Sequence, residues 1–416
     1  MPFSQLRICM LSAHSCPVGK LGTKDTGGMS VYIREIASEL GKQGHVVDVY
    51  TRAHDPQDRQ IYELGQNARL IHLRAGVDEE IHKLALYAHL PAFVSNLESF
   101  RRSTSARYDL IFSHYWLSAL AGTHLHRRWH VPHVAMFHTL GAVKNSIREA
   151  SHAALGKKEP RLRIETESAL VRRCTRIIAS TDKEKRALVS HYAAPSRKIS
   201  VVPCGVNLER FRVTGKAPAR HRLGLDTERI IMFVGRIDPL KGADNLIKAL
   251  PYLRHIPRLR LMIVGGGEHS QREIGQLQKL ANNLEVQNLV DFRGLIKHED
   301  LPDFYNAADA CVVPSYYESF GLVALESLAC GTPVVATDVG NHKNLIREGD
   351  TGYVAEDNDP RRLADKIALL LSRSESNAES AQSIRGTVSS LSWSNIAEAI
   401  ARHCQSVLAK HAAPAS

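Results

Sequence analysis

The chain has 416 residues, more than one hydrophobic core usually organises, so we expect two domains of about 200 residues each. Its 44% hydrophobic and 23% charged residues are ordinary for a folded protein in water, and no apolar run reaches the roughly 18 residues that cross a bilayer. The formal net charge of +11 comes without a nucleic-acid recognition motif, so we exclude nucleic acid and attribute the charge to surface residues and a site for phosphorylated substrates.

Short apolar runs alternate with helical patterns along the chain, as expected for an α/β fold with parallel sheets and helices on both faces. The first series of expected strands comprises Leu6–Leu11, Val46–Tyr50, Leu110–Phe112, His133–Phe137, Arg176–Ala179 and Ile199–Val202. The second series comprises Ile230–Val234, Leu259–Val264, Leu289–Phe292, Ala310–Val313 and Pro333–Ala336. Two such series predict two doubly wound, Rossmann-like domains, whose ligands bind outside the carboxyl ends of the strands.

The segment between the two series is rich in Pro and Gly. It runs from Pro203 to Pro218 and predicts the domain boundary. Near the other end of the chain, a polar, Ser-rich stretch, Ser372–Ser390, precedes a last helix that we expect over Ser394–Leu408.

The cysteines bear on the compartment. There are seven, with no Cys-x-x-Cys pair, which argues against a disulfide framework and against structural zinc. The first residues lack the pattern of a signal peptide, so we expect a cytoplasmic protein. His124 and His126 lie on an expected helix, but two histidines are too few ligands for a metal site.

Three segments of the first series carry candidate site residues. Gly27 and Gly28 follow the first strand and open a helix, where backbone N–H groups can bind an anion; a plain loop-to-helix transition explains them equally well. Tyr115 and His138 each follow a later strand of this series. A histidine in such a place is often a satisfied core residue, so position alone leaves the role of His138 open.

In the second series, two cations follow the first strand. Arg236 and Lys241 would lie at its carboxyl end, where fixed positive charges can stabilise a departing diphosphate. Gly265 follows the next strand and permits either close approach to a ligand or a tight turn.

Two glutamates flank the start of a helix after Ala310–Val313. We expect Glu318 just before this helix and Glu326 two turns further along it. The unpaired N–H groups of a helix N-terminus suit sugar hydroxyls or phosphate oxygens, and each carboxylate can accept a pair of hydroxyl hydrogen bonds. The alternative is a loop charge and a solvated helix face.

The stretch around these glutamates, with the later Gly331-Thr332-Pro333-Val334, resembles the signature of retaining glycosyltransferases of family 4, which have the two-domain GT-B architecture. The resemblance implies that Glu318 contacts the donor sugar, Glu326 binds the ribose, and Arg236 with Lys241 binds the diphosphate. It also implies donor contacts from Gly27, Gly28, Gly265, Ser319, Phe320, Gly321 and Leu322. The C-terminal helix, residues 394–416, would pack back on an acceptor domain of residues 1–207, and residues 208–393 would form the nucleotide-sugar domain.

The motifs around Tyr115 and His138 are similar to those of D-inositol-3-phosphate glycosyltransferases. The resemblance implies that His138 lies beside the reacting sugar, and that four residues bind the phosphate of the acceptor: Lys83, Tyr115, Thr139 and Arg163. Two cations and two hydroxyl donors suit a dianion. At position 30 those enzymes carry an asparagine that contacts acceptor hydroxyls, so Ser30 becomes the expected acceptor contact and the carbon skeleton of the acceptor stays open. Sucrose-phosphate synthases share the Asp-Thr-Gly-Gly form of the glycine loop.

We therefore predict a retaining hexosyltransferase that moves GlcNAc or Glc from a UDP-sugar to a small phosphorylated polyol or sugar, without a cofactor or metal. One alternative is transfer to fructose 6-phosphate. Another is a membrane-surface enzyme with a lipid acceptor, for which His89–Arg102 would be the amphipathic helix. A non-catalytic nucleotide-sugar binding protein would be expected to lack Glu318, Arg236 or Lys241. We expect a monomer or homodimer, and basic pairs such as Arg101-Arg102 leave weak contact with a membrane surface open.

Overall fold

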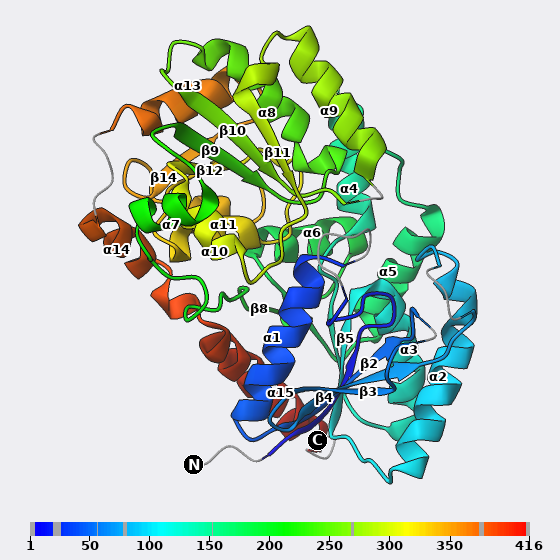
Figure 1. The fold of residues 1–416 in the computed structure, drawn as a ribbon. Coiled ribbons are helices and arrows are strands. Elements are labelled where there is room, and N and C mark those ends of the chain that lie inside the picture. Colours follow the sequence, from blue (N-terminus) through cyan, green and yellow to red (C-terminus); the bar gives the residue numbers. More distant parts are fainter. Residues whose placement is uncertain are drawn as a thin grey trace.

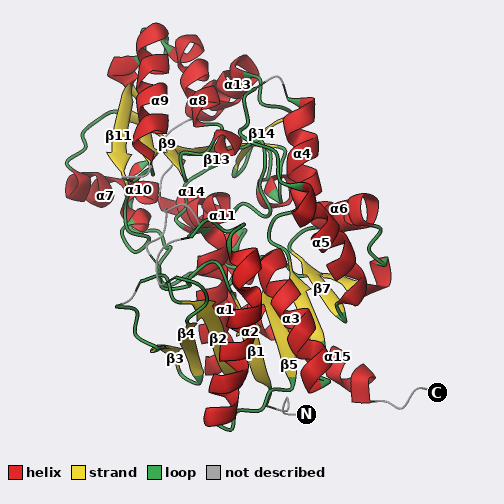
Figure 2. Ribbon diagram, turned by 90° about the vertical axis from the view of Figure 1, so that its right-hand side faces the viewer, coloured by secondary structure: helices red, strands yellow, loops and turns green. Residues whose placement is uncertain are grey.

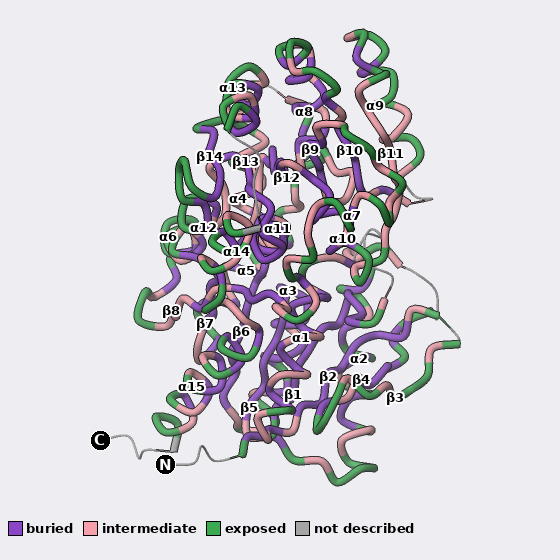
Figure 3. The backbone as a smooth tube through the Cα atoms, turned by 60° about the vertical axis from the view of Figure 1, so that its left-hand side comes forward, coloured by how far each residue is buried: buried purple, intermediate pink, exposed green. Residues whose placement is uncertain are grey.

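The computed structural model describes residues 5–19, 26–55, 57–77, 81–151, 153–267, 270–373 and 378–412. Within these ranges the strands form two sheets, one in each half of the chain (Figure 1). Helices cover both faces of each sheet, which gives two three-layered α/β units (Figure 2). The central strands of both sheets are almost continuously buried (Figure 3).

The first sheet contains eight of the described strands, in the order β3-β4-β2-β1-β5-β6-β7-β8. Their bounds are β1 Arg7–Leu11, β2 Val46–Arg52, β3 Ile61–Gly65, β4 Ala68–Leu73, β5 Leu110–His114, β6 His133–Met136, β7 Arg176–Ala179 and β8 Ile199–Val201. The associated helices are α1 Gly28–Lys42, α2 Leu86–Ser103, α3 Tyr115–Trp129, α4 Gly141–Ala150, α5 Arg161–Arg173 and α6 Asp182–Tyr192. All pairs are parallel except β3 with β4, so the carboxyl ends of the central strands meet at one edge.

The second sheet contains six of the described strands, all parallel, in the order β11-β10-β9-β12-β13-β14. Their bounds are β9 Arg229–Val234, β10 Leu259–Val264, β11 Val290–Gly294, β12 Ala310–Val313, β13 Val334–Thr337 and β14 Gly352–Ala355. The helices of this half are α7 Lys216–Leu223, α8 Ala243–Ala249, α9 Gln271–Asn283, α10 Leu301–Ala307, α11 Leu322–Ala329, α12 His342–Leu345, α13 Pro360–Leu371 and α14 Ala378–Gly386. The two doubly wound sheets predicted from the strand–helix alternation are therefore confirmed.

Each strand expected from an apolar run is present, with ends that shift by at most two residues. Three strands were missed. β3 and β4 form an antiparallel pair at the sheet edge, and polar residues interrupt the apolar pattern of both strands. β14 begins at a glycine whose φ of 148° lets its backbone lie against Val334 of β13.

The described part of the polar stretch before the last helix is largely helical. It includes α14, where Arg385 donates hydrogen bonds to the carbonyls of Leu208, Phe211 and Ala329. These hydrogen bonds join segments that are distant in sequence, so they cannot be predicted from the local sequence pattern.

The last helix, α15 (Trp393–Ala412), crosses back to the first sheet and lies beside α1 (Figure 1). The ring of Trp393 packs edge-on against Tyr32 of α1, with centroids 5.5 Å apart. Gly205 permits this approach, because a Cβ at that position would lie 2.8 Å from the Trp393 ring. Val206 also donates a backbone hydrogen bond to Leu391, so the segment after β8 and the segment before α15 run side by side. Among the described residues, no helix combines the length and apolar character needed to span a membrane.

Candidate functional site

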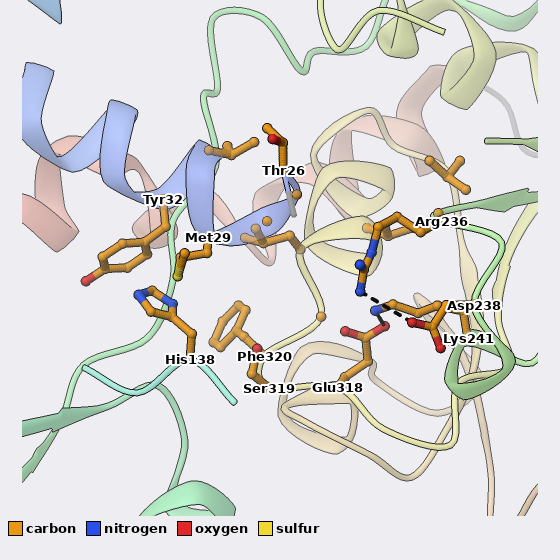
Figure 4. Close-up of a pocket in the computed structure, with 18 of the residues that line it drawn as sticks. Thr26, Met29, Tyr32, His138, Arg236, Asp238, Lys241, Glu318, Ser319 and Phe320 are labelled. Atoms are coloured by element: carbon orange, nitrogen blue, oxygen red, sulfur yellow. Dashed lines mark hydrogen bonds and ion pairs between the residues drawn. The ribbon is translucent and has the colours of Figure 1, made fainter. Parts of the chain in front are cut away.

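A cavity of about 340 Å³ lies between the two sheets, at the carboxyl ends of their strands. Most of the site residues expected from the sequence line it (Figure 4). They are Gly27, Gly28, Lys83, Tyr115, His138, Thr139, Arg236, Lys241, Gly265, Glu318, Ser319, Phe320, Gly321, Leu322 and Glu326. The lining does not include Ser30 or Arg163, both of which are 0% exposed.

Glu318 is held by two donors from the second half of the chain. Its Oε1 accepts hydrogen bonds from Nζ of Lys241 at 2.6 Å and from Oγ of Ser315 at 2.9 Å. Burial alone would raise the pKa of the Glu318 carboxyl, but the Lys241 ammonium and these hydrogen bonds bring the pKa below its ordinary value. Glu318 is therefore a partly buried, ionised carboxylate with a fixed orientation.

The loop from β9 supplies a second pair of opposite charges. Arg236 lies 3.6 Å from Asp238, whose carboxylate caps the following turn by accepting a hydrogen bond from the backbone N–H of Leu240. Burial would raise the pKa of Asp238, but Arg236 and the Leu240 N–H lower it. The carbonyl of Leu240 accepts the N–H of Tyr316, which ties this loop to the segment before Glu318.

Position 321 requires glycine for two reasons. It adopts a φ of 112°, and an added Cβ would lie 2.6 Å from Nε2 of the buried His342. Gly321 is also the residue immediately before α11, so it sets where the unpaired N–H groups of that helix begin. Glu318 lies a few residues before α11, as the sequence predicts.

Glu326 lies on α11 and is oriented by two ring systems. Its Oε1 lies 2.7 Å from Nε2 of His298, and its Oε2 accepts a hydrogen bond from the Tyr305 hydroxyl at 3.0 Å. The alternative considered from the sequence, a solvated helix face, is excluded, because Glu326 is buried at the cavity wall.

Glycines bring separate segments together at this cavity. Gly28, at the start of α1, approaches the second half so closely that a Cβ would lie 3.1 Å from a methyl group of Leu322. Gly265 has a φ of 139°, and its Cβ would collide with the carbonyl of Gly235 at 1.8 Å. Gly265 is thus needed for the packing of neighbouring strand ends, whatever it contacts in a ligand.

The other end of the cavity is basic. Lys83 precedes α2 in a turn, and so is not the solvated helix lysine considered from the sequence; it lines the cavity together with Lys144 of α4. Nζ of Lys144 lies 3.3 Å from Oε1 of Glu159. Burial lowers the pKa of Lys144 to about 8, and Arg163 and Lys83 add to the effect.

Arg163 lies behind this basic end. Its guanidinium donates to Oε1 of Glu167 at 2.7 Å and to both oxygens of Thr139, at 2.7 Å to the carbonyl and 3.0 Å to Oγ1. It also stacks under the ring of Tyr115, 4.8 Å from the centroid. In this conformation Arg163 supports Tyr115 and Thr139, and these two residues form the cavity wall.

Ser30 faces away from the cavity. Its Oγ lies 2.6 Å from Oγ of Ser15, in a fully buried contact between α1 and the segment after β1. Ser30 lies in the first turn of α1, and its short side chain points into the core, where an asparagine would reach further.

His138 combines a strained backbone with a neutral ring. Its φ is 59°, in the left-handed region that side chains other than glycine seldom adopt. Burial lowers its pKa to about 3, so the imidazole carries no charge at neutral pH. Its ring packs edge-on against Tyr32 at 5.2 Å (Figure 4).

Several residues that line the cavity were not assigned from the sequence, and four of them have polar side chains that contact other site residues. His14 stacks on Tyr115 at 4.2 Å, and the Tyr317 hydroxyl accepts the N–H of Leu140 at 3.3 Å, which joins the two halves. The others are Lys144 and His298. Lys144 belongs to the same sequence motif as His138 and Thr139 and lies in the first turn of α4, which starts at the cavity. Its position in this motif could therefore have predicted that it lines the cavity.

The fold and this site define a GT-B glycosyltransferase, an enzyme with two α/β domains around a central cleft. Residues 26–210 match the family model "Glycosyltransferase Family 4", and residues 216–386 match "Glycosyl transferases group 1". The chain belongs to glycosyltransferase family 4.

Its relatives include two proteins named D-inositol 3-phosphate glycosyltransferase. That of Geodermatophilus obscurus is 40% identical over 89% of this chain and 83% of the relative, and that of Nocardiopsis dassonvillei is 38% identical over 93% and 91%. Among solved structures, sucrose-phosphate synthase from Thermosynechococcus elongatus superposes with a TM-score of 0.88 and 32% identity, covering 98% of this chain and all of that one. Anabaena HepE in complex with UDP and glucose superposes with a TM-score of 0.76 at 18% identity over 97% of this chain, which supports the fold alone.

Proposed function

We propose that the protein transfers a sugar, GlcNAc or Glc, from a UDP-linked donor to a small phosphorylated polyol or sugar of the inositol-phosphate kind, with retention at the anomeric carbon. The observation that carries the proposal is the polarity of the cavity. One end holds paired charges suited to a nucleotide sugar, around Arg236, Lys241 and Glu318, and the other holds Lys83 and Lys144 beside hydroxyl donors.

At the donor end, Arg236 and Lys241 stabilise the diphosphate as negative charge develops on it. Glu318 accepts hydrogen bonds from the sugar hydroxyls, and its ionised state fits that role. Glu326 accepts the ribose hydroxyls, with His298 holding its orientation. We propose UDP as the nucleotide by analogy with HepE, a protein of the same fold that was solved in complex with UDP and glucose.

At the acceptor end, Lys83, Lys144, Tyr115 and Thr139 surround the phosphate. Arg163 adds positive charge from behind Tyr115 and Thr139. His14 and His138 line the space between this end and the donor end and would contact the reacting groups.

Each of the two α/β units would bind one of the two substrates. We propose that residues 1–207 with 394–416 carry the acceptor and residues 208–393 carry the nucleotide sugar. Contacts across the cleft include the ion pair of Lys183 with Asp338 and a hydrogen bond of 3.2 Å from Ser180 Oγ to the carbonyl of Ser319. Opening of these contacts would admit substrates, and closure would exclude water from the donor.

A second candidate uses the same chemistry with fructose 6-phosphate as the acceptor. It is favoured by the structural similarity to sucrose-phosphate synthase at 32% identity over the full length of that chain. The two candidates share a donor and differ only in the carbon skeleton that the acceptor end holds.

Equilibrium binding separates the two ends of the site. Calorimetric titration should show that UDP binds wild-type protein and binds Arg236→Met more weakly. The affinity of Lys144→Met for UDP should equal that of wild-type protein within about twofold. When the UDP complexes are titrated with inositol phosphate or fructose 6-phosphate, Lys144→Met should bind the phosphorylated acceptor more weakly than wild-type protein, and Arg236→Met saturated with UDP should bind it as wild-type protein does. If Lys144→Met weakened UDP but not the phosphorylated acceptor, the proposed polarity would be wrong.

A further inference from the structure

Two histidines at the carboxyl ends of the neighbouring strands β5 and β6 meet beside the cavity. His114 is the last residue of β5 and is fully buried, and its Nδ1 lies 2.9 Å from Nε2 of His138. The His114 ring packs against Phe112, with centroids 4.3 Å apart, and against Tyr32 at 5.7 Å. His114 is not among the residues that line the cavity, so it can act on a ligand only through His138.

The backbone next to both histidines is held in an uncommon conformation. Tyr115, which follows His114, has a φ of 75°, and His138 itself has a φ of 59°. Bulky residues in this region persist only where their surroundings fix them, and such positions cluster at functional sites. The fold thus constrains both rings through their backbones as well as through packing.

The two rings share a single proton position between them. Burial lowers the pKa of both imidazoles well below the ordinary value, and the neighbouring His138 ring adds to the effect at His114. Both are therefore neutral at pH 7, and each carries one N–H. A hydrogen bond between Nδ1 of His114 and Nε2 of His138 needs one N–H and one lone pair. Either His114 donates from Nδ1, or His138 donates from Nε2.

The other nitrogen of His114 decides between them. Nε2 of His114 is buried and has no hydrogen-bond partner within the described part of the chain. A proton there would leave a buried N–H without an acceptor, which is rarer in proteins than a buried lone pair without a donor. The proton of His114 therefore belongs on Nδ1, and Nε2 of His138 accepts it. The proton of His138 is then on Nδ1, on a ring that lies at the cavity wall (Figure 4).

We propose that His114 is a positioning residue that fixes His138 as the Nδ1–H tautomer, so that His138 donates a hydrogen bond to an oxygen of the sugar in the cavity. This inference rests on the proposed function, in which the sugar lies beside His138. A neutral hydrogen bond of ordinary strength changes a rate by about 3- to 12-fold, and that is the effect expected when the tautomer is lost.

Nitrogen NMR of full-length protein labelled with ¹⁵N-histidine tests the tautomer without any turnover. The His138 signals are assigned by their loss in His138→Gln. The expected spectrum of wild-type protein shows a protonated, pyrrole-type Nδ1 and an unprotonated, pyridine-type Nε2 for His138. The opposite assignment in wild-type protein would overturn the proposal without reference to a variant or to the substrate.

Variants at position 114 test the consequence for transfer. His114→Phe keeps a planar ring but has no donor, so the tautomer preference of His138 should disappear and kcat should fall about 3- to 12-fold, with KM for the acceptor changing by less than about twofold. His114→Asn places an amide nitrogen near the Nδ1 position and should recover most of the loss. His124→Phe, on the exposed side of α3, is the matched control.

Unchanged kcat in His114→Phe despite a changed His138 spectrum would overturn the role in transfer. If the wild-type spectrum is as expected but no UDP-sugar is turned over, the proposed function fails and the tautomer assignment stands.

Discussion

Replacement of Lys144 by methionine tests the basic end of the cavity. The substitution keeps an unbranched apolar stem of nearly the same length and removes the ammonium group with its charge and N–H donors. It does not strand Glu159, because that carboxylate also lies 2.9 Å from Nη1 of Arg163. The loss is therefore a lost contact to the acceptor phosphate, and a hydrogen bond to a charged group contributes about 1.5–3 kcal/mol. We expect kcat/KM for a phosphorylated acceptor to fall about 10- to 150-fold.

The pH dependence supplies a second, independent readout. Burial, with Arg163 and Lys83, lowers the pKa of Lys144 to about 8, so the ammonium is charged below this pH and neutral above it. In wild-type enzyme, kcat/KM for the phosphorylated acceptor should fall as pH rises through about 8, and this limb should be absent in Lys144→Met. The phosphate of the acceptor titrates near pH 6, below this window.

Initial rates are measured by UDP release over pH 6.5–9.5, a range of about three units around the Lys144 pKa, with the phosphorylated acceptor and its dephosphorylated form. Lys158→Met is the matched control, because Lys158 is an exposed lysine that pairs with Glu149. Equal losses with the two acceptors, or an unchanged alkaline limb in Lys144→Met, would refute the assignment of Lys144 to the phosphate.

Three further predictions concern the donor end and the scaffold. Lys241→Met should lower kcat about 10²- to 10³-fold in steady-state assays, because a fixed cation at the departing diphosphate is lost; a change only in KM would contradict this. Gly321→Ala should lower the melting temperature, since its φ is 112° and an added Cβ would lie 2.6 Å from a buried histidine nitrogen, whereas Gly275→Ala, with no atom within 4 Å, should not. Glu167→Leu should reduce the unfolding free energy by about 3–5 kcal/mol in urea titrations, because it removes the fully buried carboxylate that pairs with Arg163 and leaves Glu159 as the remaining carboxylate beside that guanidinium. Glu165→Leu, on the exposed side of the same helix, should change it by less than about 0.5 kcal/mol, and similar losses in the two variants would argue against a buried pair.

The donor end could be predicted from sequence because its residues lie within short, continuous motifs. Glu318 and Glu326 are separated by a loop and a helix whose start Gly321 fixes, so their spacing in sequence determines their relation in space. Arg236 and Lys241 likewise follow a single strand, β9. Local chemistry was sufficient in both cases.

The acceptor end depends on contacts between distant segments, and the sequence resolved it less well. Arg163 was expected in the cavity, yet Glu167 and Thr139 hold it behind the wall, and a carboxylate one helical turn away was the only local sign of this. Ser30 lies on the right helix but points toward Ser15. The pairing of His298 with Glu326 joins α11 to the loop before α10 and has no signature in either segment.

The most direct test of the central claim is the mass of the product formed from UDP-GlcNAc or UDP-glucose with D-inositol 3-phosphate, fructose 6-phosphate and their dephosphorylated forms. The account predicts a glycosyl-inositol phosphate or a phosphorylated disaccharide that disappears when the acceptor phosphate is removed. Equal product from phosphorylated and dephosphorylated acceptors, or donor binding with no product from any phosphorylated acceptor, would contradict it.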